Sequence, residues 1–296
     1  MGKWSFKIFV FPLLYFISIL PFWILYPLSN FFYFIIFYIV GYRKKVVIQN
    51  LKNSFPEKSE KEIDLITKQF YRHFCDVIFE TIKLYTISKE KLNQRCTFSD
   101  EAVKTLNIFF DKGQSIVGVI GHMGNWEWGA ILHQVYFKQL ITGVYHPLSN
   151  KSFDAFMLKL RSRFGGNIVS MSALYKEILT LRQKKIPTTI GLIADQTPPP
   201  ENAYWTTFLN QDTPVFVGTE KLAKKFNYPV VYLPIIKLKR GYYQLGAIVI
   251  TENPKDLADG EISRLHTLAL EKNIQQQPAF WLWSHRRWKH KRPIKA

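Results

Sequence analysis

The chain has 296 residues, of which 40 are Lys or Arg and 22 are Asp or Glu, and its formal net charge is +18. Hydrophobic residues make up 47% of the chain and aromatic residues 16%, which is enough for a large core and excludes a disordered chain. The mean hydropathy of −0.06 excludes a polytopic transporter. The two cysteines, Cys75 and Cys96, lack the spacing of metal ligands, so we interpret them as reduced packing residues.

The N-terminal segment is the most apolar part of the chain. No charged residue occurs in the 35 positions from Ile8 to Tyr42. A transmembrane helix needs about 20 apolar residues, and the apolar part of a signal peptide has only about 7–15. We therefore expect residues 1–42 to remain in the mature protein as a membrane anchor. Three prolines interrupt the run, which leaves two shapes open: a single span with an interfacial helix, or a hairpin that enters and leaves on one face.

The charges that flank this segment predict its orientation. Lys3 and Lys7 precede it, and three basic residues follow it at 43–45. Basic residues stay on the cytoplasmic side of a membrane, so a hairpin, which keeps both flanks there, is weakly favoured over a single span. In both cases we expect residues 43–296 to form a domain on the cytoplasmic face.

The remainder of the chain has the pattern of one α/β domain. Residues 43–86 are predicted to be helical, with Ser59 and Glu62 as a capping box. Beyond residue 115, apolar runs alternate with amphipathic stretches, which indicates a mixed, mostly parallel sheet flanked by helices. The predicted strands are 115–120, 141–145, 188–194, 230–236 and 243–250, and the predicted helices are 126–139, 152–164, 173–184, 214–226 and 260–276.

The segment GHMGNWEWG, residues 121–129, carries the strongest candidate for chemistry. It places His122 at the carboxyl end of a predicted buried strand, where ligands bind in open α/β sheets. Glu127 is five residues further on, about 500° around a helix, so the two side chains meet only if His122 lies on a loop before the helix. Glu127 would then fix the imidazole tautomer for general base catalysis. Alternatively, His122 caps the helix and Glu127 complements its dipole, and the residues alone favour neither reading.

The same segment resembles the His-x4-Asp/Glu signature of the glycerolipid acyltransferase superfamily. More narrowly, it is similar to the lipid A biosynthesis late acyltransferases of the lauroyl or myristoyl type, whose motif reads GH-x-GNWE. Four further blocks resemble that family in the same order, and with the apolar N-terminus the resemblance covers essentially the whole chain. These blocks are residues 145–150 (YHPLSN) with 161–166 (RSRFGG), 194–196 (ADQ), 215–219 (VFVGT) and 277–289 (QPAFWLWSHRRWK).

The resemblance implies transfer of a fatty acyl group from acyl carrier protein or coenzyme A to a hydroxyl of a lipid A precursor at the inner membrane. His122 would deprotonate that hydroxyl for direct attack, and Glu127 would hold the imidazole. Neither cysteine lies near the motif, so no covalent acyl-enzyme is expected. Asn125, the backbone amides after Gly124 and an arginine are candidate donors to the oxyanion. No cofactor beyond the thioester substrate and no metal ion are expected.

Three polar residues beyond this motif each have two possible roles. Arg161 and Arg163 could bind a phosphate of the acceptor or the carrier, or could be solvated cations at a helix end. Asp195 ends a predicted strand and could orient an arginine or the sugar, or cap the next turn. The neighbouring Gln196 is left without a role. The histidines at 73, 133, 146 and 266 are interpreted as surface or packing residues.

The basic C-terminal region suggests contact with a membrane. Trp283, Arg286 and Arg287 are candidate membrane or phosphate contacts, because tryptophans beside arginines suit the headgroup region. Alternatively, the tryptophans belong to the core and precede a disordered basic tail. We expect both to be partly true, with the tryptophans inside and the tail on anionic lipid.

The net charge of +18 fits an anionic membrane surface and the acidic acyl carrier protein, whereas the uncharged N-terminal segment argues against a nucleic-acid partner. Two rival functions remain. One is acylation of another membrane lipid, such as a lysophospholipid, an aminolipid or a mannosylated inositol lipid. The other is a membrane scaffold without enzymatic activity.

Overall fold

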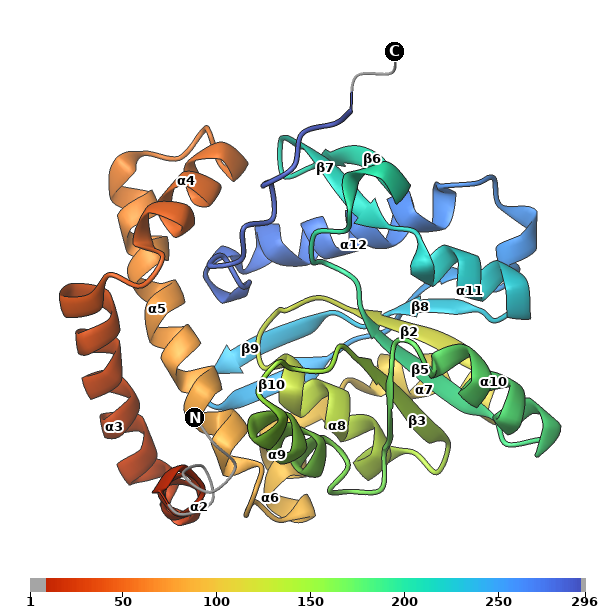
Figure 1. Ribbon diagram of the computed structural model, residues 1–296, viewed down its shortest axis with the longest axis horizontal. Coiled ribbons are helices and arrows are strands. Elements are labelled where there is room, and N and C mark those ends of the chain that lie inside the picture. Colours follow the sequence, from red (N-terminus) through yellow and green to blue (C-terminus); the bar gives the residue numbers. More distant parts are fainter. Residues whose placement is uncertain (1–8, 294–296) are drawn as a thin grey trace.

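The computed structural model describes residues 9–293 (Figure 1). At its centre is a six-stranded sheet in which every neighbouring pair is parallel except the edge pair of β11 and β8. All residues of β2 and β8 and the first three residues of β5 are buried, as in a sheet covered on both faces. In spatial order the strands are β11 (Ile248–Thr251), β8 (Val230–Tyr232), β2 (Ile116–Ile120), β5 (Thr188–Ile193), β3 (Leu140–Tyr145) and β4 (Asn167–Ser170).

Helices cover both faces of this sheet, and Figure 1 shows them as separate layers. One face is covered by α8 (Trp126–Tyr136) and α9 (Lys151–Arg161), and the other by α11 (Gly218–Phe226) and α12 (Glu261–Gln276). Helix α10 (Leu174–Gln183) packs beside β4 at the far end. The five predicted helices of this region therefore exist, although residues 214–216 belong to a strand.

Two smaller sheets correct the prediction of one mostly parallel sheet. The first contains β1 (Cys96–Phe98), β10 (Tyr242–Leu245) and β9 (Ile235–Lys239), with β10 and β9 antiparallel. The second is the antiparallel hairpin of β6 (Ala203–Phe208) and β7 (Gln211–Phe216). The fold is thus mixed α/β, as predicted, but distributed over three sheets.

Pro234 and Gly246 explain why two predicted strands are each divided in two. The run 230–236 splits into β8 and β9 at Pro234, which has no N–H for a sheet hydrogen bond. The run 243–250 splits into β10 and β11 at Gly246, whose N–H donates to the Pro234 carbonyl at 2.9 Å. A Cβ at Gly246 would lie 2.9 Å from Pro234 Cγ, so only glycine fits this crossing.

The N-terminal helices form a layer beside the sheets. Among them, α5 lies between α3 and the sheets (Figure 1). The predicted capping box at its start is confirmed, because the Ser59 and Glu62 side chains bond each other's backbone N–H groups. The helices are α2 (Phe11–Ile19), α3 (Phe22–Phe34) with its π-helical continuation η2 (Ile35–Val40), α4 (Lys44–Ser54), α5 (Glu60–Lys83), α6 (Lys89–Arg95) and α7 (Asp100–Phe110). Short 3-10 turns occur at η3 (Pro200–Asn202), η4 (Pro254–Asp256) and η5 (Pro278–Phe280).

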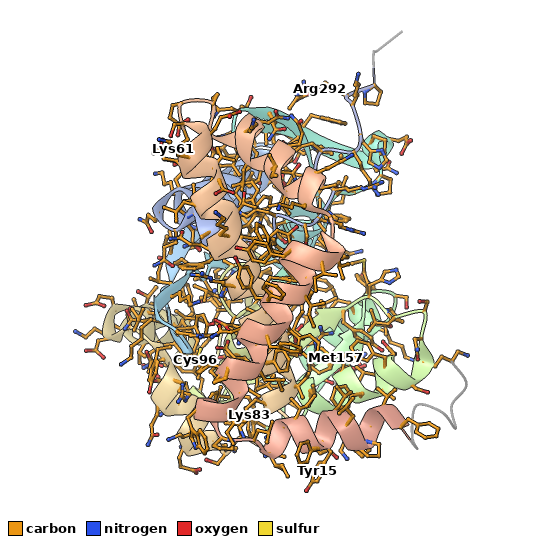
Figure 2. All side chains as sticks on the ribbon, turned by 90° about the vertical axis from the view of Figure 1, so that its left-hand side faces the viewer. Tyr15, Lys61, Lys83, Cys96, Met157 and Arg292 are labelled. Atoms are coloured by element: carbon orange, nitrogen blue, oxygen red, sulfur yellow. The ribbon has the colours of Figure 1, made fainter. Side chains whose placement is uncertain are left out.

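The segment α2–α3–η2 forms hydrogen bonds to α5 on its inner side and exposes apolar side chains on its outer side. Ser29 donates to Asp76 Oδ1 at 2.7 Å, and Lys83 Nζ donates to the Ser18 carbonyl at 2.7 Å. On the outer side, Trp23 is 75% exposed and Ile39 is 68% exposed. Figure 2 looks onto this side, where Tyr15 points away from the body.

Of the described residues, Phe22–Val40 form the one helix whose length and composition would allow it to cross a membrane. The choice between a single span and a hairpin stays a prediction. Its basic N-terminal flank, Lys3 and Lys7, lies outside the described residues.

The turn between β2 and α8 is tightly fixed. Gly124 N–H donates to the Phe280 carbonyl at 2.9 Å, and Met123 forms an antiparallel bridge with Trp281. Gly124 has a φ of +53°, and a Cβ there would lie 2.8 Å from Cγ2 of Ile235 on β9. Both the backbone conformation and the packing therefore require glycine.

Replacing Gly124 by Ala is expected to lower the free energy of unfolding by about 1–3 kcal/mol, because it combines a left-handed backbone with a close contact. Gly218→Ala is the matched control, since a Cβ at Gly218 would meet no atom within 4 Å. Denaturant unfolding of the two purified variants in detergent measures the difference. Equal stability of the two variants would contradict this account of the turn.

Candidate active site

His122 and Asp195 lie together because β2 and β5 are adjacent parallel strands. Ile120 and Ile193, near the ends of these strands, are paired in register, so the residues that follow both strands meet at one edge of the sheet. Asp195 Oδ1 lies 2.6 Å from His122 Nδ1, and Oδ2 accepts the His122 backbone N–H at 2.7 Å. Trp281 Nε1 donates to the same Oδ2 at 2.8 Å. The carboxylate is thus buried and fully engaged.

The charges of this pair stabilise each other. Burial alone would raise the pKa of Asp195, but the positive charge and hydrogen bonds of His122 and the Trp281 hydrogen bond lower it to about 2. Burial alone would lower the pKa of His122, but the charge and hydrogen bond of Asp195 outweigh it and raise it above its ordinary 6.5. Asp195 is therefore ionised at neutral pH.

The carboxylate also determines the tautomer of His122. Because ionised Asp195 only accepts hydrogen bonds, the neutral imidazole carries its proton on Nδ1 and presents a lone pair on Nε2. Nε2 lies 3.4 Å from Nε2 of Gln196, which is an exposed residue. His122 Nε2 can therefore accept a proton, and the exposed side chain of Gln196 lies next to it.

The expected contact between His122 and Glu127 is absent from the structure. Glu127 lies in the first turn of α8, as predicted, but its carboxylate accepts Arg161 Nε at 2.9 Å and Nη2 at 2.6 Å. Asp195 takes the place on the imidazole that we expected for Glu127. Glu127 acts on His122 only through its charge, which contributes to the raised pKa of the imidazole.

The two arginines likewise have partners other than those expected. Arg161, the last residue of α9, forms a two-point ion pair with Glu127 instead of a solvated helix end. Burial would lower the pKa of Arg161, but Glu127 raises it. Arg163 donates to the backbone carbonyls of Leu84 and Ile87 and so fixes the turn after α5.

The side chain of Asn125, one of the expected oxyanion donors, is already engaged within the fold. Asn125 is fully buried; its Oδ1 accepts the Trp128 N–H and caps α8, and its Nδ2 donates to Glu80 Oε2 at 2.8 Å. The Gly124 N–H is bound to the Phe280 carbonyl. Asn125 thus has a structural role at the start of α8.

An apolar pocket extends between α8 and the sheet, and it is linked to His122 through Trp126, one of its lining residues. Trp126, Glu127 and Arg161 line it, and the Trp126 ring lies 5.1 Å from the His122 ring. It encloses about 870 Å³ of unfilled space, including its opening. Further lining residues come from α8 and from β2, β3 and β5: Ile120, Ala130, Ile131, Ile141, Val144, Thr189 and Ile193.

Three glycines create the floor of this pocket. Gly118 on β2 pairs with Gly191 on β5, which pairs with Gly143 on β3. All three line the pocket, so three adjacent strands lack side chains at one level of the sheet. The sequence signal was a single glycine inside each apolar strand, which indicates close approach of another group, and our sequence reasoning did not use it.

The C-terminal candidates divide into buried and exposed residues. Trp283 is buried and donates to the Pro278 carbonyl at 2.6 Å. Arg287 is also buried; it donates to the Pro214 carbonyl at 2.7 Å, and burial lowers its pKa to about 10. Neither residue can contact a membrane in this fold, which corrects their assignment, whereas Arg286 is exposed and its lipid contact stays a prediction.

Within the part of the chain that the structure describes, His, Cys, Asp and Glu side chains form no group of three or more that could hold a metal ion.

No curated protein matches the chain. Residues 2–290 match the model of the family described as bacterial lipid A biosynthesis acyltransferase. Because this match covers nearly the whole chain, the protein belongs to the bacterial lipid A biosynthesis acyltransferase family.

Proposed function

We propose that this lipid A acyltransferase moves a fatty acyl group from a thioester of acyl carrier protein or coenzyme A to a hydroxyl of a lipid A precursor, with His122 as general base. The family supports acyl transfer in lipid A biosynthesis. The observation that carries the assignment of the base is the buried Asp195 carboxylate on His122 Nδ1, which leaves Nε2 to accept a proton. The apolar pocket beside the imidazole supports a fatty acyl substrate.

The reaction follows from this arrangement as a direct transfer. The acceptor hydroxyl gives its proton to His122 Nε2 while its oxygen bonds the thioester carbonyl carbon. The carbon–sulfur bond of the tetrahedral intermediate then breaks, and the leaving thiolate takes the proton back from the imidazolium. Asp195 stabilises the imidazolium and keeps the ring in position throughout. No protein nucleophile takes part, since both cysteines are buried away from the pocket.

Gln196 is the side chain we propose to contact the reacting groups. Its amide nitrogen lies 3.4 Å from His122 Nε2, and the residue is exposed to an incoming substrate. The amide can donate to the thioester oxygen or orient the acceptor hydroxyl. The Glu127–Arg161 pair has a different role in this proposal: it fixes the polar entrance of the apolar pocket.

The apolar pocket is proposed to hold the acyl chain. A flexible hydrocarbon chain needs an apolar, narrow space, and the glycine floor supplies it by removing side chains from three neighbouring strands. The thioester carbonyl would then lie near Trp126 and His122. A net charge of +18 would attract both an acidic carrier protein and the phosphates of coenzyme A, so the charge suits either donor.

The membrane contact is proposed for the outer side of α2, α3 and η2. Large apolar side chains there are exposed, among them Trp23, Phe31 and Ile39. The inner side of α3 is hydrogen-bonded to α5, so a span fully surrounded by lipid would break these contacts. We therefore propose that this segment lies in one leaflet together with the domain, on the cytoplasmic face of the inner membrane.

Replacing His122 by Ala tests the assignment of the general base. Acyl transfer is expected to fall by about 10²–10⁴-fold, because the hydroxyl loses its proton acceptor. The measurement is transfer of a radiolabelled acyl chain from acyl carrier protein to a lipid A precursor in detergent. His146→Ala is the matched control, since His146 is exposed, and it should retain activity. Full activity of His122→Ala would refute the role of this residue.

Replacing Gly191 by Ala tests the acyl pocket. A Cβ at Gly191 would make an ordinary contact of 3.4 Å with Ile141 Cδ1, so the variant should fold but with a shallower floor. We expect the preferred donor chain to shorten by about one or two methylenes. Competition between donors of different chain length measures this preference, with Gly218→Ala as the control. An unchanged preference would show that the acyl chain binds elsewhere.

A further inference from the structure

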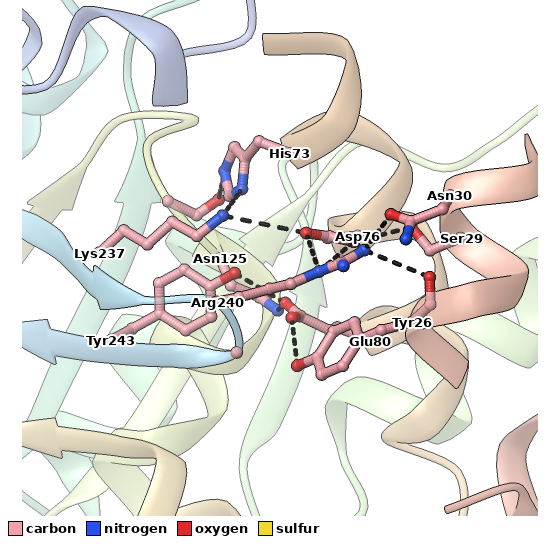
Figure 3. A network of polar contacts seen from close by, with 12 residues as sticks. Tyr26, Ser29, Asn30, His73, Asp76, Glu80, Asn125, Lys237, Arg240 and Tyr243 are labelled. Carbon is pink, nitrogen blue, oxygen red and sulfur yellow. Dashed lines mark hydrogen bonds and ion pairs between the residues drawn. The ribbon is translucent and has the colours of Figure 1, made fainter. Parts of the chain in front are cut away.

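A second pocket, which shares no lining residue with the apolar one, is polar. We call it the basic pocket, and it encloses about 1450 Å³ including its open side. Residues of α3, α5, β9 and η5 line it, and Figure 3 shows several of them around Asp76. Its charged residues are Arg72, Asp76, Lys237, Lys239 and Arg240.

These side chains leave an excess of positive charge. Asp76 is the single carboxylate of the lining, and it is bound by Arg240, whose Nη2 lies 2.6 Å from Oδ1. Lys237 Nζ is 3.9 Å from Asp76 Oδ2, so one carboxylate serves two cations. With Arg72 and Lys239, four cations face one anion, a formal excess of three positive charges.

His73 is uncharged and does not change this excess of positive charge. Its Nε2 lies 3.1 Å from the Gly124 carbonyl, to which it donates, and its Nδ1 accepts from Lys237 Nζ at 3.1 Å. Burial and the neighbouring Lys237 lower its pKa well below 6.5, so the ring is neutral. The Lys237 ammonium is itself only 10% exposed, which favours an anionic partner within the pocket.

Arg72 and Lys239 are the cations free to bind a ligand. Both are exposed, and within residues 9–293 neither forms a salt bridge. Each rests over an aromatic ring: Arg72 Cζ is 5.2 Å from the Tyr33 ring centre, and Lys239 Nζ is 4.3 Å from that of Tyr242. These contacts hold the cations at the pocket without neutralising them.

The basic pocket joins the proposed membrane face to the catalytic loop. Asn30 and Tyr33 of α3 line it, and the adjacent Phe31 and Phe34 are 59% and 52% exposed on the outer side. On the other side, His73 is bound to Gly124. The backbone from Gly124 to His122 spans at most about 7 Å.

We propose that the basic pocket binds a phosphate monoester of a membrane lipid. A phosphate monoester carries up to two negative charges and several acceptor oxygens, which suit an excess of three positive charges from Lys and Arg. The apolar side chains beside the pocket would lie among the lipid chains while the phosphate enters at headgroup level. This site rests on the membrane contact of the proposed function, and its lipid is either the acyl acceptor or a phospholipid of the bilayer.

The double variant Arg72→Gln/Lys239→Gln tests the site, because both side chains are exposed and their loss should leave the fold intact. The matched control is Lys104→Gln/Lys176→Gln, which removes the same charge from exposed positions on α7 and α10. The first measurement is affinity for phosphatidylcholine vesicles that contain phosphatidic acid, compared with phosphatidylglycerol vesicles of equal surface charge. The test variant should lose about 10-fold or more in affinity for phosphatidic acid relative to the control.

The second measurement identifies which lipid supplies the phosphate. The ratio of kcat/KM for a phosphorylated lipid A precursor to that for the dephosphorylated precursor is determined for both double variants. If the acceptor supplies the phosphate, this ratio falls by about 10-fold in the test variant only. If a bilayer phospholipid supplies it, the ratio stays unchanged while affinity for phosphatidic acid vesicles is lost.

The proposal is overturned if the test variant equals the control in both measurements. It is also overturned if affinity for phosphatidic acid and phosphatidylglycerol falls equally, since that result indicates a general charge effect. Absence of acyl transfer by the unchanged protein would count against the proposed function, whereas the vesicle measurement would still decide whether the basic pocket binds phosphate.

Discussion

The hydrogen bond between Asp195 and His122 is the interaction on which the site depends. A buried carboxylate is costly unless it is paired, and here three donors compensate it: the imidazole, the His122 N–H and the Trp281 indole. These donors come from two parts of the fold, the loop after β2 and the segment after η5. The pairing of β2 with β5 supplies the first two, and η5, fixed to the loop through Phe280 and Gly124, positions the third. The six-stranded sheet and Trp281 therefore both position donors for this one carboxylate.

Helix α5 connects this site to the membrane-facing segment. Its residues His73, Asp76, Glu80 and Lys83 follow one helical stripe and are buried, although they are polar. Glu80 accepts from Asn125, which caps α8, and from Tyr26 on α3. Burial and the nearby Asp76 raise the pKa of Glu80 to about 7, partly opposed by hydrogen bonds from Tyr243 and Asn125. One helix thus holds both the apolar N-terminal helices and the loop that carries His122.

The sequence predicted the position of His122 correctly because that prediction needs only local information: a buried strand, a glycine and a helix cap. Its partner was assigned wrongly, because Asp195 is 73 residues away and reaches His122 only through the order of strands in the sheet. Periodicity also misses breaks that tertiary packing requires, as Pro234 and Gly246 show. The buried polar residues of α5 could not be recognised from the sequence, because the same helix also has a regular apolar pattern. The three glycines of the pocket floor could have been recognised, because each is a single glycine within an apolar strand. The ion pair between Arg161 and Glu127 could not be predicted from the sequence, because it depends on how α8 and α9 pack against each other.

The most direct measurement of the central claim is the pKa of His122, determined by nitrogen NMR of the labelled imidazole in the unchanged protein and in Asp195→Asn. Loss of the carboxylate leaves burial, which disfavours the charged ring, so the account predicts a pKa above 6.5 in the unchanged protein and a lower one in the variant. Since the base must be neutral to accept a proton, the acid limb of kcat/KM should move to lower pH together with this pKa. An identical His122 pKa in the two proteins would contradict the account, because Asp195 would then have no influence on the base.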